Sequence, residues 1–273
     1  MSLQNELIVI RGAGDLASGA AFRLARSGFP VVMIELPEPL VIRRAVSFAE
    51  AVFRGKFTVE DITAELAVSI GDINKLLKAG KMPIVADPAQ YPLKILQPAA
   101  VIDATMAKKN LGTTIDDAPI VIGLGPGFKA GVDVHAVVET CRGHDLGKVI
   151  LKGQAEPNTG VPGEIGGYRA ERILRSPGCG TFHAVKEIGD IVEKGELVAT
   201  IDGLPLYATI SGVLRGMLHS GLQVNPGMKV GDIDPRHRRE YCFTISDKAR
   251  AIAGGVLEAY LFLRRRNLTW SQN

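Results

Sequence analysis

The opening of the chain constrains its fold most, because a buried strand, a glycine-rich turn, a small-residue helix and a second strand follow one another within residues 7–35. Residues 7–10 form a short apolar run typical of a parallel strand that is buried on both faces. Gly12 and Gly14 come directly after it, and apolar residues then recur at helical spacing up to Gly28. The pattern predicts a β–α–β unit of an α/β protein with a Rossmann-like, mostly parallel sheet.

The turn also matches a dinucleotide-binding fingerprint in its Gly/Ala form, Gly12-x-Gly14-x-x-Ala17, with acidic Glu35 ending the next strand. Free N–H groups at the start of the helix would face a pyrophosphate. Glu35 would bind a ribose diol and repel a 2′-phosphate, which favours NAD over NADP. A second interpretation is that the glycines only close a tight turn and that Glu35 is solvated. The residues predicted to hold the ligand here are Gly12, Gly14, Asp15, Leu16, Ala17 and Glu35, of which Asp15 places an unfavourable negative charge beside the phosphate.

Length and charge narrow the class of protein. A chain of 273 residues favours two domains, and a formal net charge of +3 argues against a general nucleic-acid surface. No apolar stretch approaches the length of a membrane span, and the first strand begins without a signal peptide, so we expect a cytoplasmic protein without membrane contact. Three widely spaced cysteines indicate neither a disulfide framework nor a zinc site, and we expect no bound metal.

Three further apolar runs, at 83–87, 100–104 and 119–124, predict more strands of the same sheet. Charged residues follow the ends of several strands, where open α/β sheets bind ligands. The glycine-rich stretch 123–131 exposes backbone N–H groups that can form an anion-binding nest. The additional residues predicted to bind the ligand are Arg43, Lys108, Lys109, Gly125 and Gly127. The candidates for proton transfer are Asp103, Lys108 and His135.

The second half contains an internal repeat, since residues 180–202 align with residues 212–234 at a spacing of 32. Each copy predicts two short strands around a glycine turn, which resembles the all-β biotinyl/lipoyl barrel-sandwich. Carrier domains of that kind present a lysine on the central hairpin, whereas residues 202–207 contain none, so no biotin or lipoate attachment is expected. We predict a Rossmann-like nucleotide-binding domain at 1–168, a barrel-sandwich domain at 169–245 and a C-terminal helix at 246–273 that packs on the first domain or on a dimer partner.

Several longer motifs resemble those of the YqeB family of accessory proteins for selenium-dependent molybdenum hydroxylases. The resemblance implies a role in maturing or inserting a molybdopterin-type cofactor, with the hydroxylase or its cofactor-biosynthesis proteins as partners. The alternatives are an NAD-dependent oxidoreductase and a non-catalytic interaction protein. The segments that carry the resemblance are Lys108-Lys-Asn, Gly125-Pro-Gly-Phe, Glu139-Thr-Cys-Arg-Gly-His-Asp145, Pro157-Asn-Thr-Gly160, Gly231-Asp-Ile-Asp-Pro-Arg236 and Ser246-Asp-Lys-Ala-Arg250.

Overall fold

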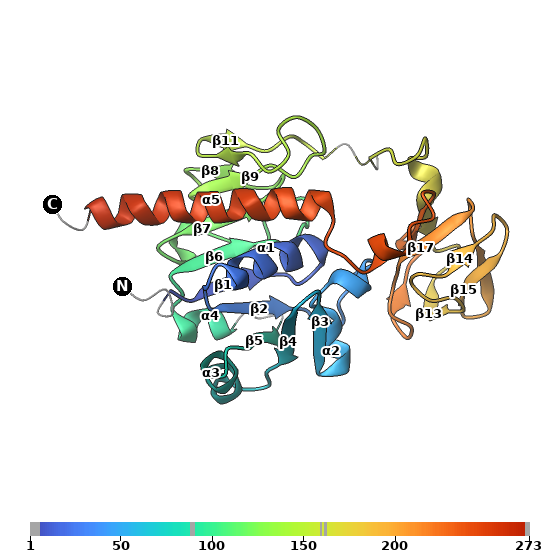
Figure 1. Ribbon diagram of the computed structural model, residues 1–273, viewed down its shortest axis with the longest axis horizontal. Coiled ribbons are helices and arrows are strands. Elements are labelled where there is room, and N and C mark those ends of the chain that lie inside the picture. The colour runs from blue at the N-terminus through green and yellow to red at the C-terminus, as the bar shows by residue number, and fades with distance from the viewer. Residues whose placement is uncertain (1–5, 88–90, 159, 161–162, 271–273) are drawn as a thin grey trace. The chain divides into compact units, whose positions relative to one another are not determined.

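The computed structural model describes residues 6–87, 91–158, 160 and 163–270, and the chain divides into two compact units (Figure 1). The first unit contains Met1–Pro37, Phe48–Asn158 and Ile245–Asn273. The second contains Glu38–Ser47 and Thr159–Thr244. A short segment that follows the second strand therefore belongs to the same unit as residues 159–244.

The first unit is built on a nine-stranded sheet whose seven central strands are parallel and whose outermost strand at each edge is antiparallel. The sheet is thus mixed, with six parallel and two antiparallel pairings between its neighbouring strands. From edge to edge the strands are β10 (Val149–Ile150), β9 (Ala136–Val138), β7 (Val121–Leu124), β6 (Ala100–Asp103), β1 (Ile8–Arg11), β2 (Val31–Glu35), β5 (Met82–Ala86), β4 (Ile62–Leu66) and β3 (Lys56–Val59). The order of connection reverses at β1, which lies between β2 and β6, so the topological switch point is the carboxyl end of β1.

Strand β1 is the middle strand of this sheet, and all four of its residues are buried. Ile8 pairs with Val31 on one side and with Ala100 on the other. The face of the sheet that carries Val9 and Val32 packs against apolar residues of two helices, among them Ile73. The helices of this unit are α1 (Asp15–Arg26), α2 (Glu50–Arg54), α3 (Ile70–Lys78), α4 (Tyr91–Leu96) and α5 (Asp247–Trp270), and a small hairpin of β8 (Lys129–Ala130) and β11 (Gly153–Gln154) completes it.

Helices α1 and α5 lie alongside each other although more than 200 positions separate them in the sequence (Figure 1). A side chain at Gly19 would place its Cβ 3.0 Å from the Cβ of Ala249, so the small residues of α1 allow this close approach. Farther along α5, the Tyr260 hydroxyl donates a hydrogen bond of 2.7 Å to Glu6 Oε2. The same tyrosine ring meets Phe29 edge-on, with 5.1 Å between ring centroids. The C-terminal helix is therefore an integral part of the first unit.

The second unit contains two separate four-stranded antiparallel sheets, so the expectation of a barrel-sandwich domain is wrong. Short 3-10 turns, Arg44–Val46, Ala170–Arg172 and Arg239–Cys242, accompany the sheets. The first sheet has the order β12 (Ile173–Arg175), β19 (Lys229–Asp234), β17 (Gly212–Met217) and β14 (Ile191–Val192). The second has the order β16 (Leu204–Tyr207), β15 (Leu197–Ile201), β13 (Gly180–Ala184) and β18 (Gln223–Val224).

The two aligned segments of the second unit contain equivalent strands that exchange partners. The short strand of the first segment, β14, pairs with β17 of the second segment, and β18 of the second pairs with β13 of the first. The exchanged strands are only two residues long and lie at the edges of their sheets. Because such short strands form few ladder hydrogen bonds, each sheet ends in an open edge and the two sheets stay separate.

Candidate functional site

The turn after β1 requires a glycine at its first position. Gly12 has φ +93°, which disfavours residues with a side chain. A Cβ there would also lie 2.9 Å from the carbonyl oxygen of Ala104 and 3.2 Å from the Cα of Thr105. The backbones that leave β1 and β6 therefore touch at the switch point, and the chain after Gly12 is directed into helix α1.

Helix α1 begins without a side chain that satisfies its first amides. Gly14 is the N-cap residue, and no side-chain hydrogen bond caps the helix. Within the described residues, the backbone N–H groups of Gly14, Leu16 and Ala17 have no hydrogen-bond partner. Uncapped N–H groups at a helix N-terminus, together with the helix dipole, favour the binding of an anion. This geometry is what the fingerprint in the sequence predicts for a phosphate site.

Glu35 is joined to the same turn by hydrogen bonds that the sequence did not suggest. Its Oε2 accepts from the backbone N–H of Ala13 at 2.7 Å, and its Oε1 accepts from that of Leu36 at 2.7 Å. Burial raises the pKa of Glu35 above its usual 4.5, and the two backbone hydrogen bonds oppose that rise. The carboxylate holds the turn against the end of β2, and each oxygen keeps a second lone pair with which to accept from a ligand hydroxyl.

Asp15, in the first turn of α1, has a cationic neighbour. Lys248 in α5 lies close enough to Asp15 for the carboxylate to raise the pKa of the ammonium group, although burial has the larger effect and leaves that pKa below its usual value. The pKa of Lys248 is also affected by three residues that follow β9: Arg142 lowers it, and Cys141 and Glu139 raise it. Lys248 therefore moderates the negative charge that Asp15 places beside the amides of α1.

The predicted glycine nest after β7 lies against the predicted lysine segment. Gly127 has φ +112°, and a Cβ there would lie 2.8 Å from the backbone nitrogen of Lys109. Gly125 has φ +72°, and a side chain at that position would collide with the side chain of Thr140. Lys108 and Lys109 are exposed, so both ammonium groups can reach an anion. The structure thus brings Lys108, Lys109, Gly125 and Gly127 together after the neighbouring strands β6 and β7.

Asp103 lies at the end of β6, is fully buried itself, and belongs to a network of hydrogen bonds. Its Oδ2 accepts from the Thr113 hydroxyl at 2.5 Å and faces the Arg11 guanidinium at 3.5 Å, while Arg11 also donates to Thr113. Its Oδ1 accepts from both the N–H and the hydroxyl of Thr105, at 3.1 and 2.7 Å. With no exposed surface and both oxygens engaged, Asp103 joins the ends of β1 and β6. This arrangement favours a structural role over the proton transfer suggested by the sequence.

Of two other predicted residues, His135 lies away from the turn and Arg43 belongs to the second unit. The Nδ1 atom of His135 accepts from the backbone N–H of Val121 at 3.0 Å. Val121 begins β7, so His135 lies near the amino ends of the parallel strands, whereas the Gly12 turn lies at their carboxyl ends. Burial lowers the pKa of this histidine. Arg43 belongs to the second unit, where it donates to the carbonyl oxygens of Tyr241 and Thr244 at 3.1 and 3.5 Å.

Glu139 organises the loop after β9 and has no local sequence signal. It is 3% exposed, and its Oε1 accepts from the N–H groups of Thr140 and Cys141, both at 2.7 Å. Its Oε2 accepts from the N–H of Glu156 at 2.8 Å, which lies 17 positions away. Because the partners are backbone amides, only the folded chain reveals this role.

Throughout the described ranges, no three His, Cys, Asp or Glu side chains gather closely enough to hold a metal ion.

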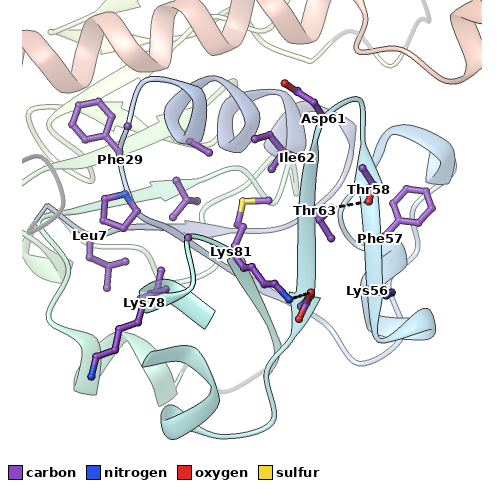
Figure 2. A pocket seen from close by; sticks show the side chains of 18 of the residues that line it. Leu7, Phe29, Lys56, Phe57, Thr58, Asp61, Ile62, Thr63, Lys78 and Lys81 are labelled. Atoms are coloured by element: carbon purple, nitrogen blue, oxygen red, sulfur yellow. Dashed lines mark hydrogen bonds and ion pairs between the residues drawn. The ribbon is translucent and has the colours of Figure 1, made fainter. Parts of the chain in front are cut away.

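A pocket of about 1200 Å³ lies near the amino ends of β2 and β5, away from the Gly12 turn at the carboxyl end of β1 (Figure 2). It is lined by residues where β2 and β5 begin, including Val31 and Met82, and by the β3–β4 hairpin. Thr58 and Thr63 form a hydrogen bond of 2.8 Å across that hairpin, and Lys81 forms an ion pair of 2.6 Å with Glu65 (Figure 2). None of the residues that the sequence predicts for ligand binding or proton transfer lines this pocket.

Comparison with known proteins shows similarity to a YqeB protein but transfers no activity. No protein-family model matches the chain. The chain is 50% identical, over 264 residues and 97% of its length, to the uncharacterized protein YqeB of Escherichia coli strain K12. It spans about half, 49%, of that relative's length. Along nearly its whole length, the chain is therefore similar to about half of a YqeB protein.

Similarity to solved structures is weak. The product-bound ectoine utilization protein EutE (DoeB) from Ruegeria pomeroyi is 13% identical, with 84% of each chain covered and a TM-score of 0.26. An aspartoacylase family protein from Mesorhizobium loti is 14% identical, again with 84% of each chain covered and a TM-score of 0.25. Scores of this size are too low to transfer a fold or an activity. In the described part of the chain, no helix has the length and apolar character needed to cross a bilayer.

Proposed function

We propose that the first unit binds a phosphate-bearing nucleotide or a nucleotide-linked molybdopterin at the carboxyl end of β1. The observation that carries this proposal is the set of N–H groups of Gly14, Leu16 and Ala17, which have no partner within the described residues and lie at the topological switch point. Lys248 supplies a cation beside them. Glu35 is the predicted acceptor for a ribose hydroxyl.

The wider proposal is that the chain serves as an accessory factor in maturing a selenium-dependent molybdenum hydroxylase. It rests on the motifs shared with the YqeB family and on 50% identity to a YqeB protein. The hydroxylase or its cofactor-biosynthesis proteins are the proposed partners. Within the first unit, this chain's residues would bind and orient a ligand through its phosphates. The engagement of Asp103 in a buried network counts against the alternative of an NAD-dependent oxidoreductase that uses it as a proton carrier.

Calorimetric titration of the full chain with NADH, NADPH and a nucleotide-linked molybdopterin tests both parts of the proposal. Binding of the pterin nucleotide that is much tighter than that of the nicotinamide nucleotides supports the accessory role. Binding of NADH alone supports the oxidoreductase instead. If none of the three binds, the phosphate site is refuted, and an interaction protein becomes the better account.

A further inference from the structure

Arg215, in strand β17 of the second unit, is a buried cation without a hydrogen bond. The residue is only 9% exposed, and its Nε has no partner. Among the described residues its guanidinium makes a single ion pair, from Nη1 to Asp234 Oδ2 at 3.5 Å, and donates no hydrogen bond. Of the five N–H donors of this guanidinium group, the one on Nε is fully buried and has no partner among the described residues, which is costly. Such a residue therefore calls for an acceptor that the described part of the chain does not supply.

The nearby carboxylate is already occupied by another arginine. Asp234 has no exposed surface, and its Oδ1 accepts from the backbone N–H and the Nε of Arg236 at 3.1 and 2.9 Å. Its Oδ2 accepts from Nη2 of Arg236 at 2.6 Å. Arg236 is held in place on its other side by Tyr241, whose ring centroid lies 4.7 Å from the guanidinium carbon. Asp234 thus binds Arg236 in a bidentate manner and leaves Arg215 with only the longer contact.

Other neighbours do not supply the missing acceptor either. Asp232 forms an ion pair of 2.7 Å with Arg172. Burial raises the pKa of the Cys242 thiol to about 11, so this side chain stays uncharged at neutral pH. Burial, and then the positive charge of Arg43, lower the pKa of Arg215, and Arg236 acts in the same direction. Asp234 and Asp232 act in the opposite direction, but burial has the largest effect and leaves the pKa of Arg215 below its usual value.

We propose that Arg215, with Arg236 beside it, binds an oxyanion: the phosphate or carboxylate group of a small ligand. The planar fork of a guanidinium matches the paired oxygens of both groups, and a buried position strengthens such charge-assisted hydrogen bonds. The side chain of Arg236 is 40% exposed, which provides an approach from solvent. This site lies in the second unit and is independent of the phosphate site at helix α1. It gives a function to the Gly231–Arg236 motif, which the first site does not use.

Amide hydrogen exchange of the full chain tests the proposal locally. Exchange is measured for peptides covering β17 and β19 in sodium phosphate, in sodium acetate and in sodium chloride of equal ionic strength. Some amides exchange only when the whole unit unfolds. An anion that binds only the folded unit slows their exchange about tenfold for each tenfold rise in its concentration above Kd. We expect phosphate or acetate, but not chloride, to slow exchange in these peptides. If only phosphate slows exchange, the site recognises phosphate, and if only acetate does, it recognises carboxylate. Equal exchange in all three salts overturns the proposal.

Variants assign the effect to Arg215. Arg215→Met keeps an apolar stem but removes the donors, and it is expected to abolish the slowing by phosphate or acetate. Arg238→Gln is the matched control, because it removes an exposed cation, paired with Glu240 at 3.2 Å, from the same unit, and it should respond like the wild type. If Arg215→Met does not fold, Arg215→Lys, which keeps the charge without the fork, should weaken the response at least tenfold. A full response in Arg215→Met or Arg215→Lys refutes the assignment. Peptides from β1 and α1 report the other site separately.

Discussion

Substitution of Gly14 tests whether helix α1 binds an anion, because this position controls the first amides of the helix. Gly14 has φ −65° and ψ −178°, an extended conformation that any residue can adopt. Aspartate there is a favourable N-cap, since its carboxylate accepts from the N–H groups of Leu16 or Ala17. We expect Gly14→Asp to stabilise the first unit by about 0.5–1 kcal/mol, from a few tenths for the cap and the rest from the helix dipole.

The same carboxylate should exclude a phosphate. Two unit charges 4 Å apart repel by about 4 kcal/mol at an effective dielectric of 20, which corresponds to about three orders of magnitude in Kd. Gly14→Asn is the matched control, because its side chain has the same size and caps the same amides without a charge. It should weaken binding by only about tenfold, roughly one net hydrogen bond.

Calorimetry with the tightest-binding nucleotide and denaturant unfolding followed by circular dichroism measure the two effects. The expected signature is opposite in sign: a more stable protein that binds its ligand far more weakly. Wild-type affinity in Gly14→Asp would refute the reasoning. Equal losses in the aspartate and asparagine variants would show that side-chain volume, and not charge, controls the site.

Three further predictions concern the same edge of the sheet. Gly12→Ala should lower the free energy of unfolding by about 2–4 kcal/mol in urea titrations, because positive φ and the contact with Ala104 both oppose a Cβ; an unchanged value would contradict this. Glu35→Gln should cost about 1–3 kcal/mol, because an amide cannot accept from both backbone N–H groups. Burial raises the pKa of Glu35, so the protonated form contributes stability that is fully present below pH 4.5 and lost as pH rises through the raised pKa. The wild type should therefore lose stability relative to Glu35→Gln over that range, and a constant difference would refute the shift. Lys248→Gln should weaken nucleotide binding about tenfold at neutral pH. Wild-type affinity measured by calorimetry should fall as pH rises through the lowered pKa of Lys248, and the variant should lack this fall.

The first β–α–β unit could be predicted from sequence because its signals are local. The apolar run at 7–10 and the run at 31–35 lie within a residue of β1 and β2 as the structure has them. The β3–β4 hairpin was not predicted, since it turns at Glu60, a non-glycine residue with φ +53°, and no glycine marks it. The N-cap of α3 was not predicted either: it is Ser69, whose hydroxyl accepts from the Asp72 N–H.

The parts of the site that sequence could not predict depend on distant residues. Lys248 approaches Asp15 only because α5 packs on α1, and Glu139 accepts from the amide of Glu156, which belongs to a different loop. Arg11 and Thr113 enclose Asp103 from separate segments, so a residue interpreted as reactive is buried. The arrangement of the second unit was missed for a related reason: a repeat predicts equivalent strands but not whether two sheets close on each other.

The central claim is that the first amides of helix α1 bind a phosphate. It is tested most directly by following the backbone ¹H–¹⁵N resonances of Gly14, Leu16 and Ala17 during titration with a nucleotide-linked molybdopterin or NADH. Our account predicts that these three signals shift together, with one binding constant, and that Gly14→Asp abolishes the shifts. It is contradicted if the ligand saturates the protein while the three signals stay in place.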